Sequence, residues 1–204
     1  MRVSKKYLNN FTMEFGSIKA YKRISSWRKS YKIRLNNNDL IRMDFLKGKD
    51  KTINMQKTGL ANGLTCFPEI LGLVNDGSRI VKLSEWIDGE IFTTLFESGS
   101  LDENMFFMLG DQVGRMNNIK NSKGASLHND DLTFRNMVWT DKPVIIDMDR
   151  TSYDPRPDNS LVKILLKRII DRNFINAFLE GYSQHRDVSN LSALCEARNW
   201  TWKR

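Results

Sequence analysis

The chain has 204 residues, a formal net charge of +8 and a hydrophobic fraction of 40%. This length allows one sizeable core or two small lobes. The sequence contains no run of 18 apolar residues, so it predicts no membrane-spanning helix. The first residues, MRVSKK, lack the apolar stretch of a signal peptide, so we expect a cytoplasmic protein. The two cysteines and two histidines form no Cys/His cluster, which argues against a structural zinc site.

Positive charge is concentrated near the amino terminus. Residues 1–35 contain ten Lys or Arg residues and one acid, Glu14, so this segment alone exceeds the excess charge of the whole chain. Such a segment predicts an anionic partner, for which nucleotide phosphates, a membrane surface, an acidic glycolipid and nucleic acid are the candidates. A solvated basic face without a partner is the alternative.

The first part of the chain has the pattern of a small sheet. Alternating apolar residues predict strands at 31–35 and 40–45, joined by a tight turn at 36–39. Residues 51–63 predict a short helix, and residues 67–74 and 79–87 predict two strands joined by a turn at 75–77. Arg42 lies mid-strand, where it faces either a cleft or solvent, and we favour the cleft. Lys29 lies in a basic turn that could wrap phosphates or simply be exposed.

The second part of the chain has mainly helical periodicity. Residues 88–90 break the strand pattern and predict a linker, so we expect one domain at 1–88 and another at 89–204. Apolar residues from Asp102 recur at helical spacing, and residues 160–182 predict one or two helices that end near Gly181. A hairpin with its turn at 141–143 lies between them. The sequence therefore predicts an α+β fold with two lobes.

Two short segments carry residues suited to phosphoryl transfer. Asp131 precedes Asn136 by five positions, and Asp147 follows Asn136 by eleven positions at the end of a β-branched run. Phosphoryl transfer to a hydroxyl requires a residue that accepts or orients its proton and oxygen ligands for Mg²⁺. The alternative is that turns collect Asp and Asn for conformational reasons.

These segments resemble motifs of the protein-kinase-like superfamily. Residues 127–138, LHNDDLTFRNMV, are similar to its H-G-D-L-x-x-x-N catalytic loop, and residues 145–149, IIDMD, are similar to its metal-binding strand. Residues 83–89, 109–116 and 153–158 resemble the inter-lobe hinge, the helix before the catalytic loop and the segment after the metal-binding strand. The resemblance is to the small-molecule branch: aminoglycoside phosphotransferases, choline kinases and lipopolysaccharide-core sugar kinases. It implies a two-lobed protein-kinase-like fold with a small β-rich N-lobe and a mainly helical C-lobe.

The resemblance also implies ATP and Mg²⁺ as cofactors. Asp131 would be the catalytic base, and Asn136 and Asp147 would bind Mg²⁺, with Asp149 as a further candidate ligand. One extra residue precedes Asp131 relative to the motif, so Asp130 competes as base, although the spacing to Asn136 favours Asp131. The histidine that begins the motif is expected to brace the loop through hydrogen bonds, or else to be half-buried without a special role.

The nucleotide would be bound by residues from the first part of the chain. Arg42 would take the place of the lysine that pairs with the ATP phosphates, and Lys29 would contact the phosphates from its turn. The hinge residues Glu85 and Ile87 would bind adenine through the backbone.

The sequence thus predicts an ATP-dependent phosphotransferase that moves the γ-phosphate to a hydroxyl of a small molecule or glycolipid. The residues DMDR at 147–150 look most like the sugar kinases that act on lipopolysaccharide core. A minimal atypical Ser/Thr protein kinase and an inactive kinase-like module that binds polyanions or membrane are the alternatives. Residues 1–35 would provide peripheral contact with an anionic inner-membrane surface, whereas nucleic acid is not a favoured partner.

Overall fold

A computed structural model describes residues 16–24, 30–47, 51–75, 79–166, 169 and 171–197. Contacts divide the chain into two compact units, one formed by Met1–Asp50 and Pro68–Trp86 and the other by Lys51–Phe67 and Ile87–Arg204. Residues 51–67 therefore group with the second unit, which differs from a simple division at residue 88. The described residues contain a five-stranded antiparallel sheet and six α-helices, which confirms the α+β class.

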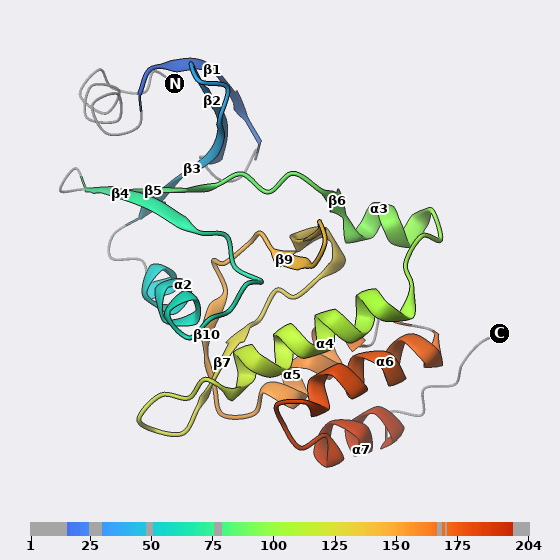
Figure 1. The fold of residues 1–204 in the computed structure, drawn as a ribbon. Coiled ribbons are helices and arrows are strands. Elements are labelled where there is room, and N and C mark those ends of the chain that lie inside the picture. The colour runs from blue at the N-terminus through green and yellow to red at the C-terminus, as the bar shows by residue number, and fades with distance from the viewer. Residues whose placement is uncertain are drawn as a thin grey trace. The chain divides into compact units, whose positions relative to one another are not determined.

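The first unit contains the five-stranded sheet (Figure 1). Its strands are β1 (Ile18–Arg23), β2 (Ser30–Leu35), β3 (Leu40–Lys47), β4 (Ile70–Asn75) and β5 (Arg79–Glu85), in the order β1-β2-β3-β5-β4. All neighbouring strands are antiparallel. The predicted β2–β3 hairpin is confirmed, with Asn38 at φ 71° in its turn. Asn tolerates this left-handed conformation better than most residues do, which explains its place in the turn.

The two faces of this sheet differ in polarity because side chains alternate along each strand. On one face, Lys32 lies opposite Arg42, and Asp44 lies opposite Lys82. The other face carries an apolar cluster of Tyr31, Ile33, Leu35, Ile41, Met43, Val81 and Leu83. The strand pattern was readable in the sequence because the apolar face must be buried and the polar face need not be.

The second unit contains the six helices and several short strands. The helices are α2 (Lys51–Ala61), α3 (Phe92–Glu97), α4 (Glu103–Asn118), α5 (Pro157–Ile164), α6 (Arg172–Ser183) and α7 (Ser189–Ala197). The strands are β6 (Glu90–Ile91), β7 (Ser126–Asn129), β8 (Met137–Trp139), β9 (Pro143–Ile145) and β10 (Thr151–Asp154), with a 3₁₀ turn, η1 (Phe134–Asn136), before β8. β7 pairs with β10, and β8 pairs with both β6 and β9. No helix in the described ranges is long and apolar enough to cross a bilayer.

Helix α4 forms as its sequence predicts. The Asp102 carboxylate accepts a hydrogen bond from Met105 N at 2.8 Å and so caps the first turn. The apolar side chains of the helical stripe are buried in the main core of the unit. α4 and α6 lie side by side (Figure 1), and this close packing requires glycine at several positions along their contact.

The structure refines three features of the sequence prediction in the second unit. α6 ends at Ser183, close to the predicted end, but Gly181 itself lies inside the last turn, where a Cβ atom would collide with the backbone oxygen of Phe107. The last residue of the predicted linker at 88–90 belongs to β6, because Glu90 pairs with Trp139 of β8. The one or two helices expected at 160–182 are confirmed as two, α5 and α6, although α5 begins earlier, at Pro157.

Candidate functional site

The candidate catalytic loop lies between β7 and the β8–β9 hairpin. The hairpin is confirmed by the register in which Met137 lies opposite Ile145. One step beyond this pair, Ile146 N donates to Asn136 O at 2.9 Å. Asn136 and Asp147 therefore occupy neighbouring backbone positions, although eleven residues separate them in the sequence.

A buried asparagine ties the two predicted segments together. The Asn129 side-chain nitrogen donates to Asp147 O at 2.9 Å and to Thr151 Oγ1 at 3.1 Å. Its side-chain oxygen accepts from Asp131 N at 2.7 Å. Asn129 is 0% exposed and is the last residue of a fully buried strand. Sequence reasoning assigned it no role, although an amide inside an otherwise buried strand needs hydrogen-bonding partners.

Asn136 is fixed within the same loop. It is 9% exposed, and its side-chain nitrogen donates to Asp131 O at 3.0 Å. Since the amide nitrogen is bound to the loop backbone, the amide oxygen is the atom that Asn136 offers to a cation. The Asp131 carboxylate is only partly buried and lies 3.6 Å from Arg135 Nη2. The Arg135 side chain is 73% exposed, so this ion pair contributes little to stability.

Asp147 and Asp149 lie directly after β9. Asp149 N donates to Asp147 Oδ1 at 3.3 Å, which turns the Asp147 carboxylate back over its own loop. The carboxylates of Asp131, Asp147 and Asp149 are not a ready-made metal cage, since they do not meet within 4.8 Å as a group of three. Mg²⁺ commonly binds to one or two protein carboxylates together with substrate phosphates and water. The carboxylate of Asp147 and the amide oxygen of Asn136 fit that kind of site.

Arg42 is part of a buried ion cluster in the first unit. Its Nε donates to both carboxylate oxygens of Asp44 at 3.0 Å, and Lys82 Nζ lies 3.8 Å from Asp44 Oδ2. These side chains are 18%, 8% and 6% exposed, so two cations share one carboxylate away from water. Sequence reasoning singled out Arg42 but missed Asp44, two residues along the same strand, and Lys82, whose contact with Asp44 depends on the pairing of β3 with β5.

Glu85, Ile87 and Lys29 are the remaining residues predicted to contact the nucleotide. Glu85 N donates to Glu69 O at 3.1 Å, and the Glu85 carboxylate accepts from Glu69 N at 2.8 Å. The Glu85 N–H is therefore engaged in the first unit and is not available to adenine. Ile87 is the first residue of the second unit after the sheet. Lys29 lies outside the described residues.

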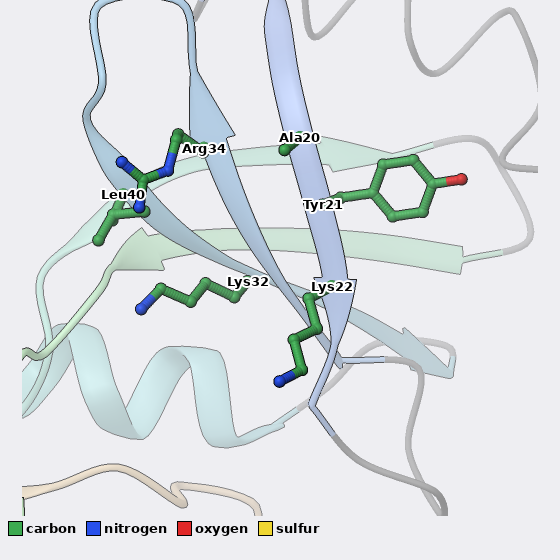
Figure 2. Close-up of a pocket in the computed structure, with 6 residues that line it drawn as sticks. All are labelled: Ala20, Tyr21, Lys22, Lys32, Arg34 and Leu40. Carbon is green, nitrogen blue, oxygen red and sulfur yellow. The ribbon is translucent and has the colours of Figure 1, made fainter.

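A basic hollow opens on the polar face of the sheet (Figure 2). Its volume is about 190 Å³, and its lining residues come from β1, β2 and the start of β3: Ala20, Tyr21, Lys22, Lys32, Arg34 and Leu40. Three of the six carry positive charge and none carries negative charge. Lys32 Nζ also lies 4.1 Å from the centre of the Trp86 ring, a cation–π contact. The hollow is suited to an anion, as the charge of residues 1–35 predicts.

His128 is buried beneath the candidate loop. It is 0% exposed, and its Nδ1 lies 3.3 Å from Asn117 Oδ1. Burial lowers the pKa of His128 below its ordinary value, in opposition to the nearby carboxylates. Asn117 in turn donates from Nδ2 to the Tyr182 hydroxyl at 3.1 Å, and that hydroxyl donates to Asp158 Oδ1 at 3.0 Å. This network joins β7 to α4, α5 and α6, consistent with the expected bracing role of His128.

Comparison of the sequence with models of known protein families and with curated proteins finds no match to this chain.

Proposed function

We propose that the protein is an ATP-dependent phosphotransferase that moves the γ-phosphate of ATP to a hydroxyl group of a small molecule or glycolipid. The observation that carries this proposal is the hydrogen-bonded junction made by Asn129. Its one side chain connects the Asp131 N–H with the Asp147 carbonyl, at 2.7 and 2.9 Å. The junction holds a candidate base and a candidate metal ligand at adjoining loops of one compact unit.

The chemistry of the proposed reaction assigns a separate task to each residue. The Asp131 carboxylate orients the acceptor hydroxyl and accepts its proton as the new O–P bond forms, while the bond between the γ-phosphorus and the β,γ-bridging oxygen breaks and ADP leaves. Asn136, through its amide oxygen, and Asp147, through its carboxylate, would hold Mg²⁺, with Asp149 as a further candidate. Mg²⁺ bound there would neutralise charge on the phosphates. The resemblance to the kinase-like superfamily further names Arg42 and Lys29 as candidates for contact with phosphate groups. Positioning supplies most of the rate in such a reaction, since the protein has little covalent chemistry to perform.

The acceptor is proposed from charge and from the resemblance of residues 147–150 to sugar kinases of the lipopolysaccharide core. The basic charge of residues 1–35 suits an anionic acceptor or the surface that carries it. A transfer assay should therefore compare lipopolysaccharide-core sugars, amino alcohols, casein and the protein itself. Transfer to casein or to the protein itself, and not to the small molecules, would favour the minimal protein kinase instead.

A second candidate function rests on the basic hollow of the first unit. A kinase-like module without activity could use Lys22, Lys32 and Arg34 to bind a polyanion or an anionic membrane. It predicts binding that weakens steeply with salt and no turnover of ATP. Heparin and anionic vesicles, each tested at two salt concentrations, distinguish this function from the enzyme.

Thermal unfolding with and without Mg-ATP tests the enzyme proposal. A ligand present at 100 times its Kd stabilises the folded protein by about 2.7 kcal/mol, so wild type should melt at a higher temperature. Asp147→Ala should lose most of this shift, whereas Asp141→Ala should keep it. Asp141 is the matched control because it is an exposed aspartate in the β8–β9 turn, bonded to Thr140. A wild type that gains no stability from Mg-ATP, or an Asp147→Ala variant that gains as much as wild type, would contradict nucleotide binding at this site.

A further inference from the structure

We propose that His128, Asp130 and Asp154 bind one divalent transition-metal ion, with Zn²⁺ or Mn²⁺ as the candidates. The site shares no residue with the proposed Mg²⁺ ligands and does not depend on the phosphotransferase proposal. The ligand atoms of these three side chains all lie within 4.8 Å of one another. Among the described parts of the chain, they are the one group of three or more His, Cys, Asp or Glu residues that meets this condition.

The pairing of β7 with β10 brings the three residues together. His128 lies opposite Ser152, and Asp154 lies opposite Ser126, so His128 and Asp154 are diagonal neighbours on one face of the ribbon. The ladder continues for one more step, because Asp130 N donates to Arg150 O at 3.1 Å. Asp130 follows His128 by two positions and therefore shares that face.

The hydrogen bonds around His128 determine which ring nitrogen carries a proton. The side-chain nitrogen of Asn117 donates to Tyr182, so its oxygen is the atom that faces His128 Nδ1 at 3.3 Å. An oxygen acceptor at this position requires Nδ1 to be the protonated nitrogen of the neutral ring. The lone pair is then on Nε2.

That lone pair faces a carboxylate. Nε2 of His128 is buried without a hydrogen-bonding partner, and Asp130 Oδ1 lies 3.7 Å away. Two electron-pair donors at this distance repel one another unless a cation or a hydrogen-bond donor lies between them. A proton on Nε2 is the rival occupant, and the ring-nitrogen measurement described below distinguishes it from a metal ion.

The other two ligands suit a metal as well. Asp154 is held in place because its oxygens accept from Arg156 N at 2.8 Å and from Ser160 Oγ at 2.7 Å. Both bonds favour the ionised carboxylate, which is the form that binds a metal ion. The Asp130 side chain is 46% exposed, which gives a cation access from solvent and leaves room for water ligands. One imidazole nitrogen and two carboxylate oxygens are donors that Zn²⁺ and Mn²⁺ accept.

The metal would select the base of the proposed reaction. With Asp130 engaged as a ligand, only Asp131 of the adjacent pair remains to meet an acceptor hydroxyl. No motif in the sequence pointed to this site, because a search for Cys/His spacing overlooks one histidine that meets two carboxylates, one of them on a distant strand.

Calorimetric titration of the full-length, metal-stripped protein with Zn²⁺ and with Mn²⁺ tests the proposal. Wild type should bind at least one of the two metals with one-to-one stoichiometry. Asp130→Asn, a change at a half-exposed side chain that should fold, should weaken binding by at least about tenfold. Asp88→Asn is the matched control, since Asp88 is exposed and lies outside the cluster. It should bind as wild type does.

Two further measurements identify the histidine that binds the metal. His185→Gln removes the other histidine, which pairs with Asp111 at 2.7 Å, and should leave the binding intact. The ¹⁵N resonances of the His128 ring in metal-free protein should show Nε2 unprotonated at pH 7.5 and should shift when metal binds. One-to-one binding by neither metal, equal affinity in Asp130→Asn, loss of binding in His185→Gln, or a proton on Nε2 would each overturn the proposal.

Discussion

Replacing Asn129 by Asp tests whether its side chain holds the two candidate catalytic loops together. The substitution keeps the shape of the side chain and the acceptor for Asp131 N. It removes the N–H groups that donate to Asp147 O at 2.9 Å and to Thr151 Oγ1 at 3.1 Å. The Thr151 hydroxyl can rotate to donate to the new carboxylate, whereas the Asp147 carbonyl is left facing a negative oxygen.

The cost follows from the burial of this position. Asn129 is 0% exposed, so water compensates neither the lost hydrogen bond nor the buried charge. An unsatisfied buried acceptor costs about 1–3 kcal/mol, and burying the carboxylate adds to it. We expect a loss of about 3 kcal/mol in the free energy of unfolding at pH 7.5. The introduced carboxyl should have a pKa above its unfolded value, so the loss should shrink as the pH falls and the group becomes a neutral donor.

Urea unfolding followed by circular dichroism at pH 7.5 and pH 5 measures this effect, provided that the slope with urea is unchanged. Asn121→Asp is the matched control. The Asn121 side-chain oxygen accepts from Lys123 N and Ala125 N at 2.9 and 3.0 Å, and a carboxylate preserves both bonds. A loss of unfolding free energy below about 1 kcal/mol for Asn129→Asp, or one equal to that of Asn121→Asp, would refute the conclusion that the Asn129 side chain holds the two loops together.

Two other predictions concern the core of the second unit. Gly181→Ala should destabilise the protein by about 2–4 kcal/mol and lower its melting temperature, because the new methyl group would collide with the Phe107 backbone. This cost exceeds the gain from the better helix propensity of alanine. Ser183→Ala, at an exposed position of the same helix, is the control and should alter the melting temperature little. Burial raises the pKa of Cys66 to about 12, so this thiol should not react with a thiol reagent between pH 7 and 9. Native protein should then label at the half-buried Cys195 alone, and unfolded protein at both; two labels on the native protein would contradict the burial of Cys66.

Local patterns account for the elements that were predicted correctly. The β2–β3 hairpin follows from alternation and a turn rich in Asn, and α4 follows from helical spacing preceded by a capping Asp102. Both signals operate within a few residues, so they do not depend on how the rest of the chain folds. The neighbourhood of Asn136 and Asp147 is also local, because the β8–β9 hairpin between them joins the two segments.

Contacts between distant segments could not be derived in this way. The pairing of β7 with β10 places Thr151 against Asn129, and the packing of α4 on α6 requires Gly181 inside a helix. The residues next to Asn129 in the sequence indicate only an ordinary turn residue. The partners that give it a role lie 18 and 22 positions away.

The residue types of the candidate site, their order and the hairpin that joins them are thus properties of the sequence. Which of the polar side chains are buried, and which carboxylate a cation or histidine faces, are properties of the tertiary structure. Lys82 reaches the Arg42–Asp44 pair because β3 pairs with β5, and Asp154 reaches His128 and Asp130 because β7 pairs with β10. Charge and hydrogen bonding act over distances in space, and only the folded chain brings segments far apart in sequence within that range.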